Sequence, residues 1–117
     1  MIKGLNSVII WTDDVARLVP FYRDVLGLDA ELFGDEFAAF LAGGPQVVLG
    51  KHSHVRGRSK DPNRVMVNLT VDDCRAEYER LRAKGVEFVR EPEEDQGLII
   101  ATFTDPDGNT LQLFQQV

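Results

Sequence analysis

Hydrophobic residues recur in the same order in both halves of the chain. Residues 5–12 are nearly all apolar, which predicts a strand buried on both faces. Residues 15–26 carry apolar side chains three and four apart, which predicts a helix that ends at Gly27. Pro20 cannot donate to the carbonyl of Ala16, so we expect a loose first turn or a kink in this helix. Three short apolar runs follow and predict an antiparallel meander: residues 28–33, 36–41 and 46–50.

The pattern starts again after a polar stretch. Residues 64–71 alternate as a strand, and Cys74, Tyr78 and Leu81 form a shorter helical stripe that ends at Gly85. Three more strands are predicted at residues 86–90, 98–104 and 110–116. In the last strand, Leu111 and Leu113 are expected on one face, with Thr110, Gln112 and Phe114 on the other.

The two halves therefore form an internal repeat. Asp14 corresponds to Asp73, 59 residues later, and Gly27 corresponds to Gly85, 58 residues later. Neither half would bury much apolar surface alone, so we expect one domain, 1–117. It comprises module one at about 1–51, an exposed linker at about 52–63 and module two at about 64–117. The predicted fold class is α+β, with two strand-helix-strand-strand-strand (βαβββ) modules curving into a cupped mixed sheet and the helices outside.

Composition and charge disfavour some classes of protein and indicate a cellular compartment. The net charge of −6 disfavours a general nucleic-acid binder, which needs a basic face. No apolar run is long enough to span a membrane, and the N-terminus lacks the pattern of a signal peptide. The single cysteine, Cys74, excludes an intrachain disulfide and suits a reducing compartment, so we expect a cytoplasmic protein.

The turn motifs, taken in order, resemble one family. They are Asp14, the run 21–28 (FYRDVLGL), Asp72-Asp73, the run 81–86 (LRAKGV) and the turn 105–109 (DPDGN). Together they resemble the glyoxalase/bleomycin-resistance/dioxygenase group, also called vicinal oxygen chelate (VOC) proteins. The resemblance implies two βαβββ modules, often completed by a second subunit, so a homodimer is expected. It does not imply one activity, because the family includes metal-dependent isomerases, ring-cleaving dioxygenases, thiol transferases and metal-free antibiotic-binding proteins.

The resemblance also locates four positions where family enzymes hold a divalent metal. The ligand on a module's first strand lies seven residues before the capping Asp, which gives Ser7 and Met66. The ligand on the last strand lies four residues after the turn glycine, which gives Val48 and Gln112. None of the four is a His or a carboxylate, and Ser and Met are poor ligands for hard cations. No metal and no cofactor are therefore predicted.

Other candidate groups have simpler explanations. His52 and His54 could hold zinc or nickel weakly, but we interpret them as solvated linker histidines. Cys74 lies at a predicted helix N-terminus, but it also belongs to the apolar stripe, which favours a buried thiol. The acidic pairs 13–14 and 72–73 are interpreted as helix caps, and the acidic run 93–95 as a solvated turn. No catalytic residue is predicted.

Strand alternation then predicts a mostly apolar face with a few neutral polar groups, which is typical of an organic-ligand site. Trp11 could stack on a planar ligand, while Asn68 and Gln112 could orient it. The predicted ligand-binding residues are Ser7, Trp11, Val48, Met66, Asn68, Phe103, Gln112 and Phe114.

These observations favour a metal-free protein of the bleomycin-resistance type, which sequesters a small organic ligand, with an aromatic one preferred. Two alternatives stay open. One is a glyoxalase-like or dioxygenase-like enzyme (lyase, isomerase or oxygenase) that uses a non-standard metal or none. The other is a non-catalytic subunit with a vestigial site.

Overall fold

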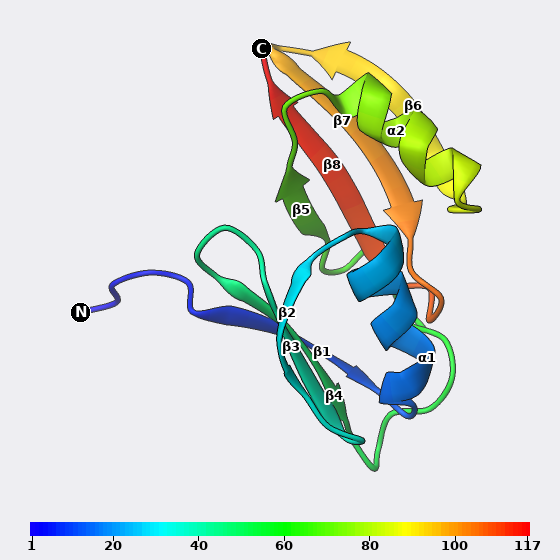
Figure 1. Ribbon diagram of the computed structural model, residues 1–117. Helices are drawn as coiled ribbons and strands as arrows, with labels where there is room; N and C mark the ends of the chain where they lie inside the picture. Colours follow the sequence, from blue (N-terminus) through cyan, green and yellow to red (C-terminus); the bar gives the residue numbers. More distant parts are fainter. The chain divides into compact units, whose positions relative to one another are not determined.

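Each half of the chain folds into a four-stranded sheet with one helical segment packed on it (Figure 1). The computed structural model describes residues 1–117, which divide into unit 1, Met1–Gly57, and unit 2, Arg58–Val117. The division falls inside the segment 52–63, which the sequence marks as the linker. The α+β class with two βαβββ modules is confirmed.

Unit 1 has the strand order β1-β4-β3-β2. The pairing of β1 with β4 is parallel, while the meander β2-β3-β4 is antiparallel, so the sheet is mixed. The elements of unit 1 are β1 (Ser7–Thr12), α1 (Val15–Pro20), the π-helical turn η1 (Phe21–Val25), β2 (Asp29–Phe33), β3 (Phe37–Leu41) and β4 (Gln46–Lys51).

Pro20 changes the helix of unit 1 as predicted. The α-helical segment α1 ends at Pro20, and the chain continues as the wider π-helical turn η1. There the amide of Leu26 donates to the carbonyl of Phe21 at 2.9 Å, five residues back. Proline has no amide hydrogen, so the regular ladder cannot pass through it. Leu18 and Tyr22 are nevertheless fully buried, and the Tyr22 ring lies 6.3 Å from that of Phe40 on β3.

Unit 2 has the equivalent strand order β5-β8-β7-β6, with β5 and β8 parallel. The helix α2 contacts β6, β7 and β8 and covers one face of this sheet (Figure 1). The core between them contains Leu81, Leu111 and Leu113, each at most 2% exposed. The elements of unit 2 are β5 (Val67–Thr70), α2 (Cys74–Ala83), β6 (Phe88–Asp95), β7 (Leu98–Thr104) and β8 (Thr110–Gln116).

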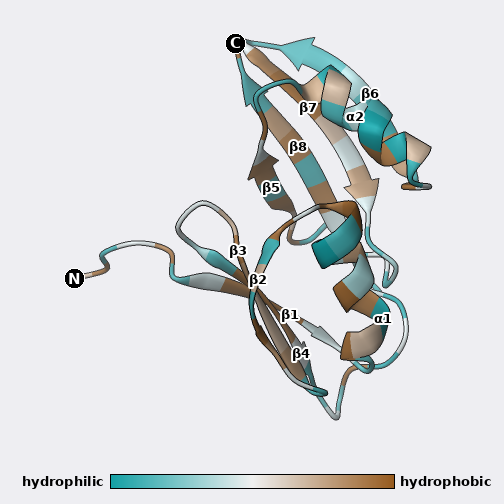
Figure 2. Ribbon diagram, in the orientation of Figure 1, coloured by the Kyte–Doolittle hydropathy of each residue, from teal (hydrophilic) through white to brown (hydrophobic).

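Two predicted boundaries in unit 2 are wrong. The strand expected at 64–71 is only Val67–Thr70, so Met66 precedes the strand. The acidic run 93–95, predicted as a solvated turn, continues β6, which is mostly hydrophilic (Figure 2). An exposed edge strand needs few apolar side chains, so hydrophobic periodicity does not reveal it. The turn itself lies at Gln96 and Gly97, both with positive φ.

The turn before β8 is held by one buried carboxylate. Asp105 is 3% exposed and accepts hydrogen bonds from the amides of Asp107 and Asn109, each at 2.9 Å. Gly108 has φ +81°, as this reversal requires. A Cβ at Gly108 would meet the Arg58 guanidinium at 2.8 Å, so Arg58, in the middle of the predicted linker, packs on this turn. The turn thereby fixes where β8 begins and which of its side chains face the helix.

Neither helix is long and apolar enough to cross a membrane.

Candidate ligand-binding faces

Each sheet has one face under its helix and one face directed away from it. Along β8, Leu111 and Leu113 are buried while Gln112 and Phe114 are half-buried, which confirms the predicted alternation. Figure 2 shows it as hydrophobic and hydrophilic bands along β8. The predicted site residues on the faces away from the helices are Ser7, Trp11 and Val48 in unit 1, and Asn68, Gln112 and Phe114 in unit 2.

Phe103 does not belong to this set, which corrects the prediction. It is fully buried, and its ring centroid lies 5.3 Å from that of Phe88, whose ring packs 4.6 Å from Tyr78 of α2. Phe103 pairs in register with Leu111, and both side chains face the helix. The sequence did not settle which face of β7 carries Phe103, because five of the seven β7 residues are apolar.

Met66 and Val48 differ from the expected lining in other ways. Met66 is 40% exposed and lies outside the strand, so pairing with β8 does not fix its direction. Val48 lies on the face away from α1 but is only 5% exposed, between its register partners Ile9 and Ala39. It can contribute the floor of a binding surface but offers no polar contact.

Unit 1 presents an apolar face centred on Trp11. Trp11, Gly50 and Phe37 are register partners across β1, β4 and β3, and the two aromatic residues are 47% and 41% exposed. A Cβ at Gly50 would lie 2.6 Å from the Trp11 ring, so the indole covers the glycine. Ile9 adds apolar surface at 46% exposure. A planar molecule could stack here, because the rings are accessible.

Two histidines extend this aromatic surface, which the sequence analysis missed. The His52 ring contacts the Trp11 indole edge-on at a centroid distance of 5.3 Å, and the His54 ring lies 5.5 Å from His52. The amide of His54 donates to His52 Nδ1 at 3.0 Å. The parallel pairing of β1 with β4 could have predicted this contact. Trp11 pairs with Gly50, so the residues just after β4 lie beside Trp11. The segment is further attached to unit 1 because the Gly57 amide donates to the Asp13 carboxylate, which lowers the pKa of Asp13 together with the nearby Arg17.

Unit 2 presents a hydrogen-bonded polar row instead. Asn68, Gln112 and Thr102 are register partners across β5, β8 and β7. The Thr102 hydroxyl donates to Gln112 Oε1 at 2.8 Å, and Gln112 Nε2 donates to Asn68 Oδ1 at 2.9 Å. These two bonds fix the Gln112 amide in one orientation. Phe114 and Ile100, half-buried register partners, form an apolar row beside it.

Cys74 is a core thiol, as predicted. It is fully buried at the start of α2, and burial raises the pKa of its thiol. Its amide donates to the side chain of Gln115 at 2.8 Å, which ties the helix start to β8. A buried thiol with a raised pKa is a poor nucleophile, so these surroundings favour a structural role for Cys74.

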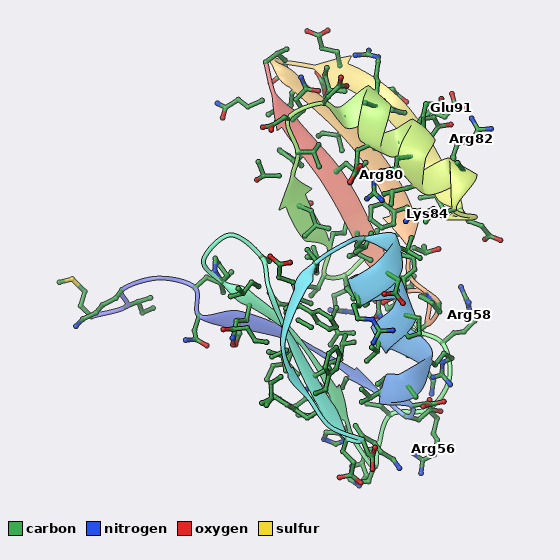
Figure 3. The ribbon with its side chains drawn as sticks, viewed as in Figure 1. Arg56, Arg58, Arg80, Arg82, Lys84 and Glu91 are labelled. Carbon is green, nitrogen blue, oxygen red and sulfur yellow. The ribbon has the colours of Figure 1, made fainter.

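The polar network on the helix side of unit 2 is structural. Arg82 donates to the Tyr78 hydroxyl at 3.2 Å and stacks on its ring, and that hydroxyl lies 3.5 Å from Glu91 on β6. Figure 3 shows Arg82 and Glu91 close together at the outer side of α2. These contacts hold the helix against the edge strand.

The sequence model of the Glyoxalase/Bleomycin resistance protein/Dioxygenase superfamily matches residues 4–113. The chain belongs to this superfamily. It is 28% identical to the metallothiol transferase FosB of Staphylococcus epidermidis, over 97% of this chain and 84% of that protein.

Solved structures from the superfamily share the fold. A member from Sphaerobacter thermophilus is 25% identical and superposes with a TM-score of 0.79, covering 98% of each chain. Lactoylglutathione lyase from Agrobacterium tumefaciens superposes with a TM-score of 0.77 at 19% identity, covering 96% of this chain and 92% of that one. These likenesses establish the arrangement of strands and helices.

The superfamily implies a divalent metal in some members, and the residues of this chain do not fit one. Ser7 is half-buried, Val48 is buried and apolar, and Met66 offers a soft sulfur. Gln112 has the one suitable oxygen, but that oxygen already accepts from Thr102. No group of three or more His, Cys, Asp and Glu side chains is gathered where it could hold an ion. At the position where the resemblance implies a carboxylate ligand, this chain has an amide that is part of a hydrogen-bonded row.

Proposed function

We propose that this protein binds a small organic molecule, with an aromatic one preferred, on the sheet faces directed away from the helices. It holds this molecule without a metal and without changing it, in the manner of the bleomycin-resistance proteins. It does so as one domain and as a homodimer, in a reducing compartment such as the cytoplasm, which suits its single cysteine. The proposed contacts are Ser7, Trp11, Met66, Asn68, Gln112 and Phe114, with Val48 as part of the floor.

The observation that carries this proposal is the state of the Gln112 amide. Its oxygen accepts from Thr102 and its nitrogen donates to Asn68, so the side chain is part of a neutral row. The Thr102 hydroxyl takes one lone pair of that oxygen, so Gln112 has one neutral lone pair left for a metal, and a single neutral ligand does not make a metal site. An organic ligand can bind to this row without breaking either of its hydrogen bonds.

The aromatic preference rests on unit 1. Trp11 is about half exposed and is bordered by His52 and Phe37. Exposed aromatic rings over a flat apolar face favour a planar partner, at about 0.5–1.5 kcal/mol per aromatic pair beyond simple burial. Trp11 is also the only tryptophan, so its fluorescence reports on this face alone.

An enzyme is the second candidate, and the relatives favour it. A protein named metallothiol transferase covers nearly the whole chain at 28% identity. An enzymatic function here would need a metal held by ligands other than the four expected positions, or a reaction that needs no metal.

Metal analysis separates the two candidates. Untagged protein is purified without chelators, and its Mn, Fe, Ni, Cu and Zn are measured by plasma mass spectrometry. It is then titrated calorimetrically with Mn²⁺, Ni²⁺ and Zn²⁺. We expect far less than one equivalent of bound metal and no tight site. A stoichiometric, tightly held ion would overturn the binding-protein proposal in favour of the enzyme.

A thermal-shift screen of aromatic antibiotics and metabolites, read in parallel by Trp11 fluorescence, tests ligand binding directly. A ligand at a hundredfold excess over its Kd stabilises by about 2.7 kcal/mol, which raises the melting midpoint by several degrees. Trp11→Leu is the matched variant and should weaken aromatic ligands. If no compound stabilises the protein, the vestigial-subunit alternative takes precedence.

A further inference from the structure

The polar row of unit 2 continues onto the edge strand, where it ends in a positive charge. Arg90 on β6 is the register partner of Thr102 on β7. Partners in an antiparallel pair point to the same face, so Arg90 shares the face of Gln112 and Asn68. One face of the sheet therefore carries Asn68, Gln112, Thr102 and Arg90, one from each of its four strands.

The hydrogen bonds within the row determine what it offers to a ligand. The oxygens of Gln112 and Asn68 each already accept a bond, from Thr102 and from Gln112 respectively. Each side-chain amide carries two N–H donors. Gln112 uses one of its donors on Asn68, while Asn68 is exposed and uses none of its own. The row thus keeps N–H donors that no protein acceptor uses, including those of the exposed Asn68 amide.

The charge at the end of the row is only weakly held. A guanidinium nitrogen of Arg90 lies 3.5 Å from a Glu93 carboxylate oxygen, and the two side chains are 37% and 65% exposed. Exposed pairs of this kind contribute about 0–1 kcal/mol, so a better placed carboxylate can compete for the guanidinium. Arginine binds a carboxylate through two parallel N–H bonds, which a single contact to Glu93 does not use.

We propose that this row receives the carboxylate of an organic ligand, with Gln112 and Asn68 donating to it and Arg90 supplying the charge. The apolar part of the ligand lies on the neighbouring row of Phe114 and Ile100. The inference rests on the proposed binding function and names its ligand class. The net charge of −6 opposes an anion only at long range, where salt screens it beyond about 10 Å, whereas the row acts in direct contact.

Three probes of one size and different charge test the proposal on the full chain: benzoate, benzamide and benzylammonium. The readout is the set of side-chain amide signals of Asn68 and Gln112 in nitrogen-proton NMR spectra of labelled protein. We expect benzoate to shift these signals at concentrations at least about tenfold lower than benzamide, since a charge-assisted bond is worth 1.5–3 kcal/mol. Benzylammonium should leave them unchanged.

Two variants of equal charge change locate the effect. Arg90→Gln should reduce the preference for benzoate over benzamide to less than about twofold. Arg75→Gln lies on α2, the opposite side of the sheet, and should keep the preference. Both side chains are partly or fully exposed, so both variants are expected to fold, which their amide spectra will show.

The outcomes separate this inference from the proposed function. Equal binding of benzoate and benzamide, tighter binding of benzylammonium, or an undiminished benzoate preference in Arg90→Gln would each overturn the carboxylate assignment. Those results leave metal-free binding intact, since the metal analysis tests that function separately. If none of the probes shifts the Asn68 and Gln112 signals while other aromatic compounds stabilise the protein, the carboxylate assignment is likewise overturned and the proposed binding function is kept.

Discussion

The two units have the same strand order but opposite chemistry on their middle rows. Unit 1 places Ile9, Val48 and Ala39 in register across the adjacent strands β1, β4 and β3. Unit 2 places Asn68, Gln112 and Thr102 in register across the equivalent strands, joined by two hydrogen bonds. A repeated backbone therefore fixes where side chains point and leaves their chemistry free. In this protein the row of unit 1 presents apolar side chains, and the row of unit 2 presents hydrogen-bonding side chains.

The next rows show how each unit fills the same space differently. In unit 1 the middle position is Gly50, and the Trp11 ring from the neighbouring strand covers it. In unit 2 the middle position is Phe114 and its neighbour on β5 is the small Thr70. Large and small residues have exchanged strands, so each row keeps one large aromatic side chain at its centre. Aromatic cover of a strand glycine is a recognised way to keep a sheet stable.

The largest expected effect contrasts the two faces of unit 2. Phe103→Ala removes a fully buried ring from the helix side and should reduce the free energy of unfolding by about 3–5 kcal/mol. Phe114→Ala removes a half-buried ring from the other face and should cost clearly less, while weakening ligand binding. Chemical denaturation measures both. Equal losses in the two variants would contradict the assignment of Phe103 to the core.

The second prediction concerns Gly50 and Trp11. Gly50→Ala places a methyl group 2.6 Å from the indole, so the ring must move, at an expected cost of about 1–3 kcal/mol. The emission of Trp11 should shift at the same time. Gly4→Ala, where nothing lies within 4 Å, is the control and should change stability little. In a Trp11→Leu background the cost of Gly50→Ala should fall, and an unchanged cost would argue against the contact.

The third prediction tests the polar row as a unit. Thr102→Val removes the donor to Gln112 and should cost about 1–2 kcal/mol, because the amide oxygen loses its partner. In a Gln112→Leu background the same change should cost less, with a coupling energy of at least about 0.5 kcal/mol. Ala39→Thr is the reciprocal change in unit 1. The register partner of Ala39 is Val48, whose side chain cannot accept a hydrogen bond from the new hydroxyl group. If the double-mutant cycle shows no coupling energy, Thr102 and Gln112 contribute to stability independently of each other.

The sequence predicted the framework of the fold well, for a physical reason. Hydrophobic periodicity and turn residues are local, so they predicted an irregularity of the helix at Pro20, which the structure shows as a π-helical turn, and the turn at 105–109. β7 and β8 were predicted with their observed bounds. The bounds of the first two strands of unit 2 were wrong: β5 is shorter than the predicted 64–71, and β6 continues past the predicted 86–90, because an exposed edge strand needs no apolar alternation.

The candidate site was predictable only in part, because contacts between strands depend on register. Alternation placed Trp11, Asn68 and Gln112 on the faces away from the helices. It could not assign a face to Phe103 within an almost continuous apolar run. The contact of His52 with Trp11 depends on the pairing of β1 with the distant β4, and the Thr102 bond to Gln112 depends on the register of β7 with β8, which the alternation of a single strand does not report.

The fourth prediction compares the two helix starts. Asp73 caps α2 by accepting from the amide of Ala76 at 3.0 Å, whereas Asp14 precedes α1 without a side-chain cap bond. Asp73→Ala should therefore cost about 1 kcal/mol, and Asp14→Ala only a few tenths. Thermal unfolding followed by circular dichroism measures both. A larger loss in Asp14→Ala would reverse the assignment of the true cap.

The smallest expected effect separates the same two helices by pH. The first turn of α2 carries Glu77, whose pKa is lowered by its hydrogen bond with Arg80, while the first turn of α1 carries no acid. A carboxyl group with a lowered folded-state pKa stabilises the fold above its unfolded pKa of about 4.3, and this contribution is lost as pH falls through the folded pKa. The pair is partly exposed, so we expect Glu77→Gln to cost only about 0.2–0.5 kcal/mol at pH 7.

The stability difference between Glu77→Gln and the unchanged protein should shrink as pH falls from the unfolded pKa of about 4.3 through the lower folded-state pKa of Glu77. Glu79→Gln is the control, because Glu79 is 70% exposed and lies 4.0 Å from Arg82. Its stability should follow that of the unchanged protein from pH 3 to pH 7. A difference for Glu77→Gln that does not shrink at all between about pH 5 and about pH 3 would mean that the side chain acts through packing on α2 and not through its charge.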